Sequence, residues 1–153
     1  MKRAVAFALM GGVLILLVVV GVLVVREGGR IADPTDAKQV ALGKVIYTDH
    51  CASCHGATLE GQPEWQTRKP DGRLPAPPQD ASGHTWHHAD DQLFGIIKNG
   101  IGAYAPPGYE SDMTAFGSVL TDEQVNAVLA FIKSNWPVDI QARQAEASRR
   151  AKQ

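Results

Sequence analysis

The stretch Cys51-Ala52-Ser53-Cys54-His55 has the spacing C-x-x-C-H, which is typical of a covalently attached haem. Two thiols three positions apart lie on one side of a helical turn, so each can form a thioether bond to one haem vinyl group. The histidine that follows is then held under the iron, to which its imidazole can bind as the proximal ligand. We therefore predict one haem c, attached to Cys51 and Cys54, with His55 as an iron ligand.

Two other uses of a cysteine pair fit the sequence less well. A zinc site of this kind needs four ligands, and the chain has two cysteines in all. A dithiol redox pair usually lies in a βαβ pattern, which the sequence does not show. A plain disulfide or thiol site remains the alternative to haem.

The length of 153 residues suggests one domain with additional segments, and the formal charge of −1 hides an uneven distribution. Residues 1–30 carry a net charge of +3, residues 31–137 carry −6, and residues 138–153 carry +2. An acidic middle argues against nucleic-acid binding, and two haem propionates would make it more acidic. It favours a partner protein with a basic docking patch, with a merely solvated acidic surface as the alternative.

A first helix is predicted from near Thr35 or Asp36, where Asp36 and Gln39 form a loose capping box, to about His50, so that the helix delivers the cysteines at its end. Val40, Gly43 and Tyr47 fall on one stripe of this helix. A glycine inside a helix costs about 1 kcal/mol relative to alanine. Close approach of another helix at Gly43 would explain it, and simple tolerance of the glycine is the alternative.

A second helix is predicted near the end of the acidic region. Thr121 and Gln124 form a capping box, and Leu120 with Val125 can form a hydrophobic staple. Pro137 ends the helical run. The apolar face of this helix consists of Val125, Val128, Leu129, Ile132 and Trp136.

Together these features resemble a membrane-anchored class I c-type cytochrome with one haem. The resemblance covers about residues 36–137 and implies an all-α fold in which the first and last helices cross at near right angles. Four residues make that crossing by resemblance: Gly43, Tyr47, Val128 and Phe131. The remaining matches are Gly56 after the haem motif and the segment Met113-Thr114-Ala115-Phe116-Gly117, where the family often has Met-Pro-Ala-Phe.

The resemblance also implies the sixth iron ligand. Met113 lies in an irregular stretch rich in glycine and proline, from Ala105 to Gly117, just before the last helix. This order matches the class I pattern, so Met113 is predicted as the second metal ligand beside His55. A histidine among positions 84, 87 and 88, or an open iron, is the alternative.

Residues 56–89 form a loop that is too long for a small domain unless it wraps a cofactor. In the family a proline carbonyl of this loop accepts a hydrogen bond from the proximal histidine, which implies Pro77 or Pro78. Trp86, together with His84, is a candidate donor to a haem propionate. The alternatives are His87 or His88 as an iron or copper ligand, or a turn with partly exposed histidines.

The N-terminal segment predicts an anchor. Ala4 to Val25 is 22 residues without a charge, and a helix of that length reaches about 33 Å, enough to cross a bilayer core of about 30 Å. The residues that follow lack a small-x-small cleavage site, so we expect an uncleaved transmembrane anchor over residues 1–27, with a cleaved signal as the alternative. A linker over residues 28–35 joins it to the haem domain at residues 36–137.

Lys2 and Arg3 favour a cytoplasmic N-terminus. The resemblance agrees, because haem is attached to c-type cytochromes outside the cytoplasm. We therefore expect a single-pass protein of a bacterial cytoplasmic (inner) membrane with its haem domain in the periplasm. The basic tail at residues 138–153 is predicted to be a marginal surface helix with a solvated end.

The predicted function is one-electron transfer. A haem iron with His and Met ligands has both axial positions filled, so substrate does not easily reach it. The chain is therefore expected to relay electrons between membrane or periplasmic redox partners of a respiratory chain, and not to be an enzyme. A haem peroxidase and a haem- or copper-binding sensor-type module are the alternatives.

Overall fold

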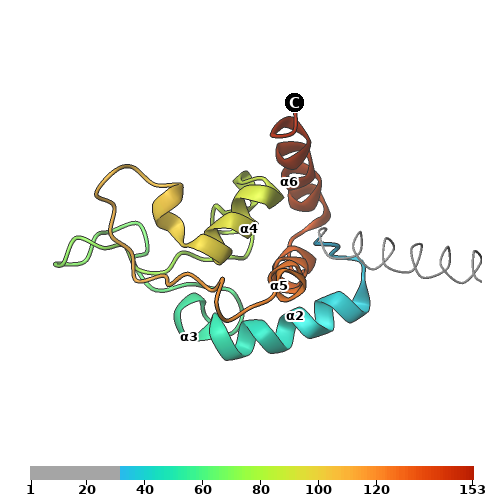
Figure 1. Cartoon of the computed structure of the whole chain (residues 1–153), viewed down its shortest axis with the longest axis horizontal. Helices are drawn as coiled ribbons and strands as arrows, with labels where there is room; N and C mark the ends of the chain where they lie inside the picture. The colour runs from blue at the N-terminus through green and yellow to red at the C-terminus, as the bar shows by residue number, and fades with distance from the viewer. Residues whose placement is uncertain (1–31) are drawn as a thin grey trace, which may run out of the picture. The chain divides into compact units, whose positions relative to one another are not determined.

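The structure is a computed structural model that describes residues 32–153, and the regular elements of this part are helical throughout (Figure 1). The anchor predicted over residues 1–27 lies outside the described residues. None of the helices within residues 32–153 is both long enough and apolar enough to cross a membrane. The elements are α2 (Ala37–His50), α3 (Ala52–His55), η1 (Thr85–His87), α4 (Asp90–Asn99), η2 (Ile101–Ala103), α5 (Asp122–Ser134) and α6 (Val138–Arg150).

Helix α2 begins and ends where the sequence predicts. Asp36 is its N-cap, and its carboxylate accepts hydrogen bonds from the N–H groups of Lys38 at 2.9 Å and Gln39 at 3.2 Å. The helix ends at His50, and Cys51 forms the corner between α2 and the short helix α3. The haem motif therefore lies at a helix end, as predicted.

Helix α5 has the predicted capping box. Gln124 N–H donates to the Thr121 hydroxyl at 3.2 Å, and Thr121 N–H donates to the Gln124 side chain at 2.9 Å. The helix ends at Ser134, and Pro137 serves as the N-cap of α6. The helix is thus shorter than the sequence predicts, because Trp136, expected on its apolar face, lies after its end.

Helices α2 and α5 pack closely at Gly43, where there is no room for a side chain. A Cβ atom at Gly43 would lie 1.9 Å from the Ala127 carbonyl oxygen and 2.9 Å from the Phe131 Cβ. One helical turn further along, the rings of Tyr47 and Phe131 pack with centroids 5.2 Å apart. Figure 1 shows α2 running across the view while α5 is seen nearly end-on, so the two helices cross. The glycine is therefore required by packing, as the resemblance implies.

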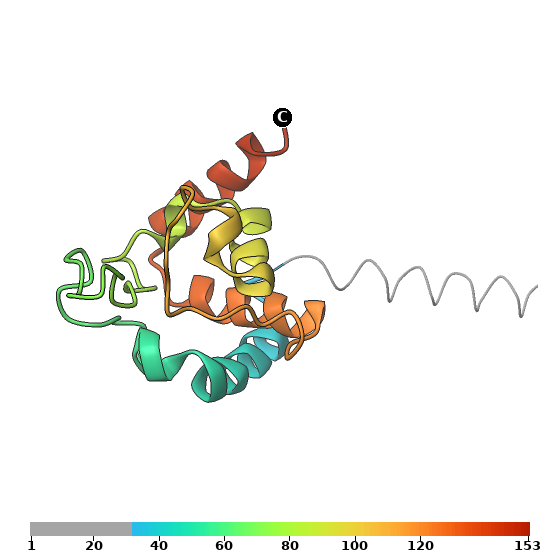
Figure 2. The same ribbon diagram turned by 60° about the vertical axis from the view of Figure 1, so that its left-hand side comes forward.

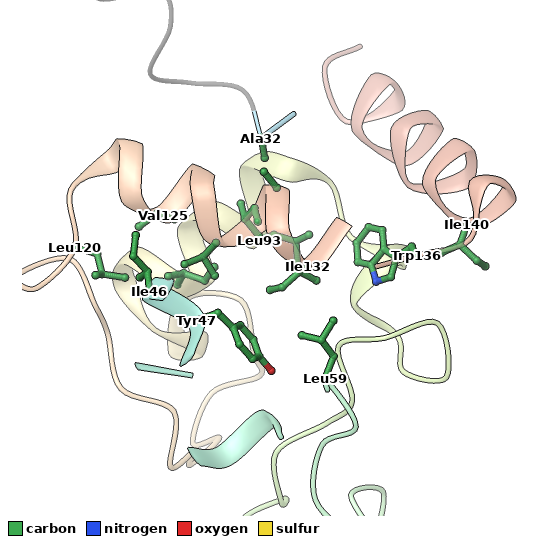
Figure 3. Packing of buried hydrophobic residues seen from close by; sticks show 14 residues of the cluster. Ala32, Ile46, Tyr47, Leu59, Leu93, Leu120, Val125, Ile132, Trp136 and Ile140 are labelled. Atoms are coloured by element: carbon green, nitrogen blue, oxygen red, sulfur yellow. The ribbon is translucent and has the colours of Figure 1, made fainter. Parts of the chain in front are cut away.

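The hydrophobic core lies around this crossing (Figure 3). Tyr47 is buried in it, and its hydroxyl donates to the Gly56 carbonyl at 2.9 Å, which ties the core to the segment just after the haem motif. Trp136 is also buried, and its indole N–H donates to the Gln79 carbonyl at 2.8 Å. Core side chains thus fasten the long loop that follows α3 at two separate points.

Helix α6 differs from the marginal, solvated tail that the sequence predicts. Gln144 is 0% exposed, and its amide donates to the His88 carbonyl at 3.2 Å and the Asp90 carboxylate at 2.7 Å. The Ser148 hydroxyl accepts a hydrogen bond from Asp90 N–H at 3.0 Å. Ile140 of the same helix joins the core cluster. The helix is stabilised by this tertiary packing, which an isolated helix of its length lacks.

A buried ion pair completes this network. Lys133 of α5 is 7% exposed, and its ammonium lies 2.9 Å and 3.0 Å from the two carboxylate oxygens of Asp90. It also donates to the Ala32 carbonyl at 3.0 Å. Ala89 holds the N-cap position of α4, and Asp90 is the first residue of the helix. The Asp90 side chain is committed to Lys133 and Gln144.

Candidate haem site

The two cysteines lie at the junction of α2 and α3, and neither forms a disulfide. Cys51 is partly buried and Cys54 is exposed, and the backbone turns tightly between them, with Cys54 N–H and His55 N–H both donating to the Cys51 carbonyl. Burial, with the neighbouring Cys54, raises the pKa of the Cys51 thiol to about 11. A dithiol redox pair needs a lowered thiol pKa, so this environment argues against that alternative.

His55 is the buried member of the motif, 9% exposed. Its Nδ1 lies 2.9 Å from the Pro77 carbonyl oxygen, and since a carbonyl can only accept, Nδ1 carries the proton. Burial lowers the pKa of His55, and the bond to Pro77 partly offsets this effect. The neutral ring therefore keeps Nε2 as a free lone pair, which is the form that binds a metal. Of the two prolines singled out in the sequence, Pro77 makes the contact.

The Pro77 carbonyl is positioned by two stretches of loop that pair with each other. Gln79 N–H donates to the Leu59 carbonyl at 2.8 Å beside it. Two glycines let the backbone of Pro78 come close: a Cβ at Gly61 would lie 2.4 Å from Pro78 N, and one at Gly83 would lie 2.0 Å from the Pro78 carbonyl oxygen. Pro78 thus belongs to the support of the histidine, while Pro77 is its partner.

Met113 lies in the predicted irregular stretch before α5. Its side chain is partly buried and packs against the same core cluster as Cys51 and Trp86. Its N–H donates to the Ser111 hydroxyl at 3.1 Å. The structure therefore brings the candidate ligand loop and the cysteine motif to one core, although they lie about sixty residues apart in the sequence.

The end of this loop is attached to α4. Phe116 N–H donates to the Ile97 carbonyl at 2.9 Å, and Gly117 N–H donates to the Lys98 carbonyl at 2.8 Å. A Cβ at Gly117 would lie 2.7 Å from that Lys98 oxygen, so the glycine permits the contact. These two bonds fix the part of the family-like Met-x-Ala-Phe-Gly segment that follows the methionine.

Two buried N–H groups within residues 32–153 have no acceptor: Nε1 of Trp86 and Nε of Arg73. A buried donor without a partner is costly, at about 1–3 kcal/mol. Each haem propionate is a carboxylate that can accept such bonds. The unpaired donors, the two thiols, the neutral imidazole and the thioether together form a set that fits a haem c.

The remaining histidines of the loop pack against aromatic rings. His84 stacks on Trp65 with centroids 5.6 Å apart, and His87 stacks on Trp86 at 3.7 Å. Burial, followed by the nearby His88 and His87, lowers the pKa of His84. No three His, Cys, Asp or Glu side chains of the described part are grouped so that they could hold a metal ion.

One part of the site is not apparent from the sequence. Arg73 Nη1 lies 2.8 Å from one oxygen of the Asp112 carboxylate, and Lys69 binds the other oxygen. The hydrogen bonds from Lys69 and Arg73 lower the pKa of Asp112. The partners are 39 and 43 residues apart, and opposite charge in two loops is the one sequence signal that hints at the contact.

Comparisons with known proteins agree with these features. Residues 40–136 match the family described as Cytochrome c. A curated relative, the Cbb3-type cytochrome c oxidase subunit FixP of Azorhizobium caulinodans, is 30% identical over 94 residues. That alignment covers 61% of this chain and 28% of the relative, so the chain spans less than a third of the relative's length. No solved structure is significantly similar to the chain.

Proposed function

Because this chain belongs to the cytochrome c family, we propose that it is a one-electron carrier with a single covalent haem c. The observation that carries the proposal is His55, a buried neutral imidazole oriented by Pro77 directly after two cysteines at a helix end. Cys51 and Cys54 would hold the haem through thioether bonds, and His55 Nε2 would bind the iron. The bound haem supplies an iron that alternates between the ferric and ferrous states.

Met113 is proposed as the second axial ligand. Met113 packs against the same core cluster as Cys51, and its thioether sulfur is a soft ligand that favours ferrous iron. With His55 and Met113 both bound to the iron, a substrate would have no free position at the metal. This arrangement supports electron transfer over a peroxidase reaction.

Trp86 and Arg73 are proposed as propionate ligands. Each has a buried N–H without an acceptor among residues 32–153. Arg73 also pairs with Asp112 through a different nitrogen, so its Nε stays available while its position is fixed. The Trp86 ring is held by stacking on His87 and by the Arg143 guanidinium, whose carbon lies 5.9 Å from the ring centroid.

The partner is proposed to be a membrane or periplasmic redox protein. The relative is, by its name, a subunit of a cbb3-type cytochrome c oxidase, which makes a terminal oxidase the first candidate acceptor. The acidic charge of residues 31–137 suits a partner with a basic patch. Crosslinking in native membranes, followed by mass spectrometry, tests this, and recovery of no redox protein would argue against it.

Replacing Met113 with alanine tests the ligand assignment. We expect a lower reduction potential and ready binding of cyanide to the ferric iron or carbon monoxide to the ferrous iron, because a position at the metal opens. His87→Ala and His88→Ala are the matched controls and should leave the iron spectrum unchanged. If the Met113 variant keeps the native spectrum and potential while a histidine variant loses them, the iron has two histidine ligands.

The N-terminal anchor remains a proposal that rests on the charge-free stretch from Ala4 to Val25. We expect the full chain to stay with the membrane fraction through a high-salt wash. A chain that starts at Ile31 behind an exchangeable signal peptide should be released as a soluble red protein. Recovery of the native chain cut near residue 30 and free in the periplasm would contradict the anchor.

A further inference from the structure

Two loops that are distant in the sequence form a clasp, which we define as Lys69 and Arg73 bound to Asp112. Figures 1 and 2 draw the loop after α3 and the loop before α5 on the same side of the molecule. The Asp112 carboxylate is shared: one oxygen accepts from Arg73 Nη1 at 2.8 Å and the other from Lys69. One anion thus bridges two cations that belong to the other loop.

Lys69 and Arg73, the cations of the clasp, lie on a turn that backbone hydrogen bonds stabilise. Lys69 N–H donates to the Arg73 carbonyl at 2.8 Å, and Gly72 N–H donates to the Lys69 carbonyl at 2.9 Å. Gly72 has a φ of 86°, a conformation that favours glycine. The turn is closed further by Asp71, whose carboxylate accepts from Arg73 N–H at 3.0 Å. Lys69 and Arg73 are therefore presented side by side before they meet Asp112.

The anion side has fewer attachments of its own. The backbone bonds that join the ligand loop to α4 lie at Phe116 and Gly117, which follow Met113. Before Met113, the loop contacts the turn at residues 68–73 through side chains. Besides the clasp, the Glu110 carboxylate lies 3.4 Å from Arg73 Nη2. The ring centroid of Tyr109 lies 5.8 Å from the guanidinium carbon of Arg68. The segment after Met113 is therefore fixed by backbone hydrogen bonds, and the segment before it is held mainly by ion pairs.

We infer that Asp112 is a positioning residue that keeps the sulfur of Met113 on the iron by clasping the ligand loop to Lys69 and Arg73. The inference rests on the proposed ligand role of Met113. Exposed ion pairs are individually weak, and the side chain of Asp112 is 47% exposed, so the clasp shifts an equilibrium and does not decide folding. Its effect should also weaken with ionic strength.

Cyanide binding to the ferric full-length protein measures this equilibrium, because cyanide binds only while the sulfur is dissociated. We expect Asp112→Asn to raise the apparent cyanide affinity roughly two- to fivefold at low salt, the range that an exposed ion pair supports. High salt should raise the affinity of the parent protein toward that of the variant. Glu123→Gln, which removes one exposed acidic charge on α5, is the matched control and should behave as the parent.

Placing Asp112→Asn in the Met113→Ala background separates positioning from a general structural role. A residue that acts through the methionine has no further effect on cyanide affinity once the methionine is gone. Cyanide affinity that is unchanged in Asp112→Asn, while Met113→Ala opens the iron, would overturn the clasp alone. A further increase in the double variant would also overturn it. If Met113→Ala leaves cyanide binding unchanged, the ligand assignment fails and the clasp fails with it.

Discussion

Replacing both Cys51 and Cys54 with alanine is expected to turn a haem that resists extraction into one that acidified organic solvent removes almost completely. Both thioether bonds are then absent, and the haem is held by axial ligands and packing alone. The domain should also fold poorly, because a chain of this size buries only a limited fraction of its surface. The long loop after His55 is expected to pack against the haem, so it would lose that contact. Haem extraction and the fraction of folded protein are the measurements.

The single variant Cys51→Ala is the control for this prediction. It keeps one thioether through Cys54, so its haem should resist the same solvent while its visible bands shift. Normal folding of the haem-free double variant would show that the protein part alone supplies enough core. That outcome would contradict the central place that we give to the haem.

Gly43→Ala is expected to destabilise the domain by about 3 kcal/mol, the upper part of the usual range for overpacking. The added Cβ would lie 1.9 Å from the Ala127 carbonyl oxygen, which belongs to helix backbone and cannot rotate away. Helix propensity alone predicts the opposite sign, since alanine is favoured over glycine by about 1 kcal/mol inside a helix. The free energy of unfolding, measured by denaturant titration of the haem-loaded protein, therefore decides between the two effects.

Gly95→Ala is a matched control, because Gly95 is also inside a helix. Its Cβ would meet the hydroxyl end of Tyr104, at 1.7 Å, but that side chain is 42% exposed and can swing aside. We expect Gly95→Ala to change stability little. Equal losses in the two variants would mean that the crossing at Gly43 is no more demanding than a surface contact.

Local signals in the sequence predict the frame of the fold. The caps at Asp36 and Thr121 and the stop at Pro137 place α2 and α5 within a few residues, because capping depends on neighbours in the chain. The haem motif and the two helices also predict the family, which the match over residues 40–136 confirms, and the all-α fold. The role of Gly43 is implied by the resemblance, and the geometry of the crossing supplies its physical reason.

The contacts that the sequence does not reveal are polar and join residues that are distant in the chain. Gln144 and Lys133 look like surface residues of amphipathic helices, but both are buried and donate to the carboxylate of Asp90, more than forty residues earlier. The pairing of Arg73 with Asp112 cannot be predicted either, since these two residues meet only after two irregular loops have taken their shape. Hydrophobic periodicity predicts which residues are buried, but it does not predict which polar side chains pair with each other.

The network at the start of α4 has a consequence for the order in which the newly made chain can assemble. Asp90 N–H and its carboxylate find their partners in Ser148 and Gln144, which lie 58 and 54 residues later in the chain. Until those residues have been made, the Asp90 N–H group at the start of α4 and the Asp90 carboxylate lack these two partners. The start of α4 therefore gains its full set of hydrogen bonds only after α6 has been made.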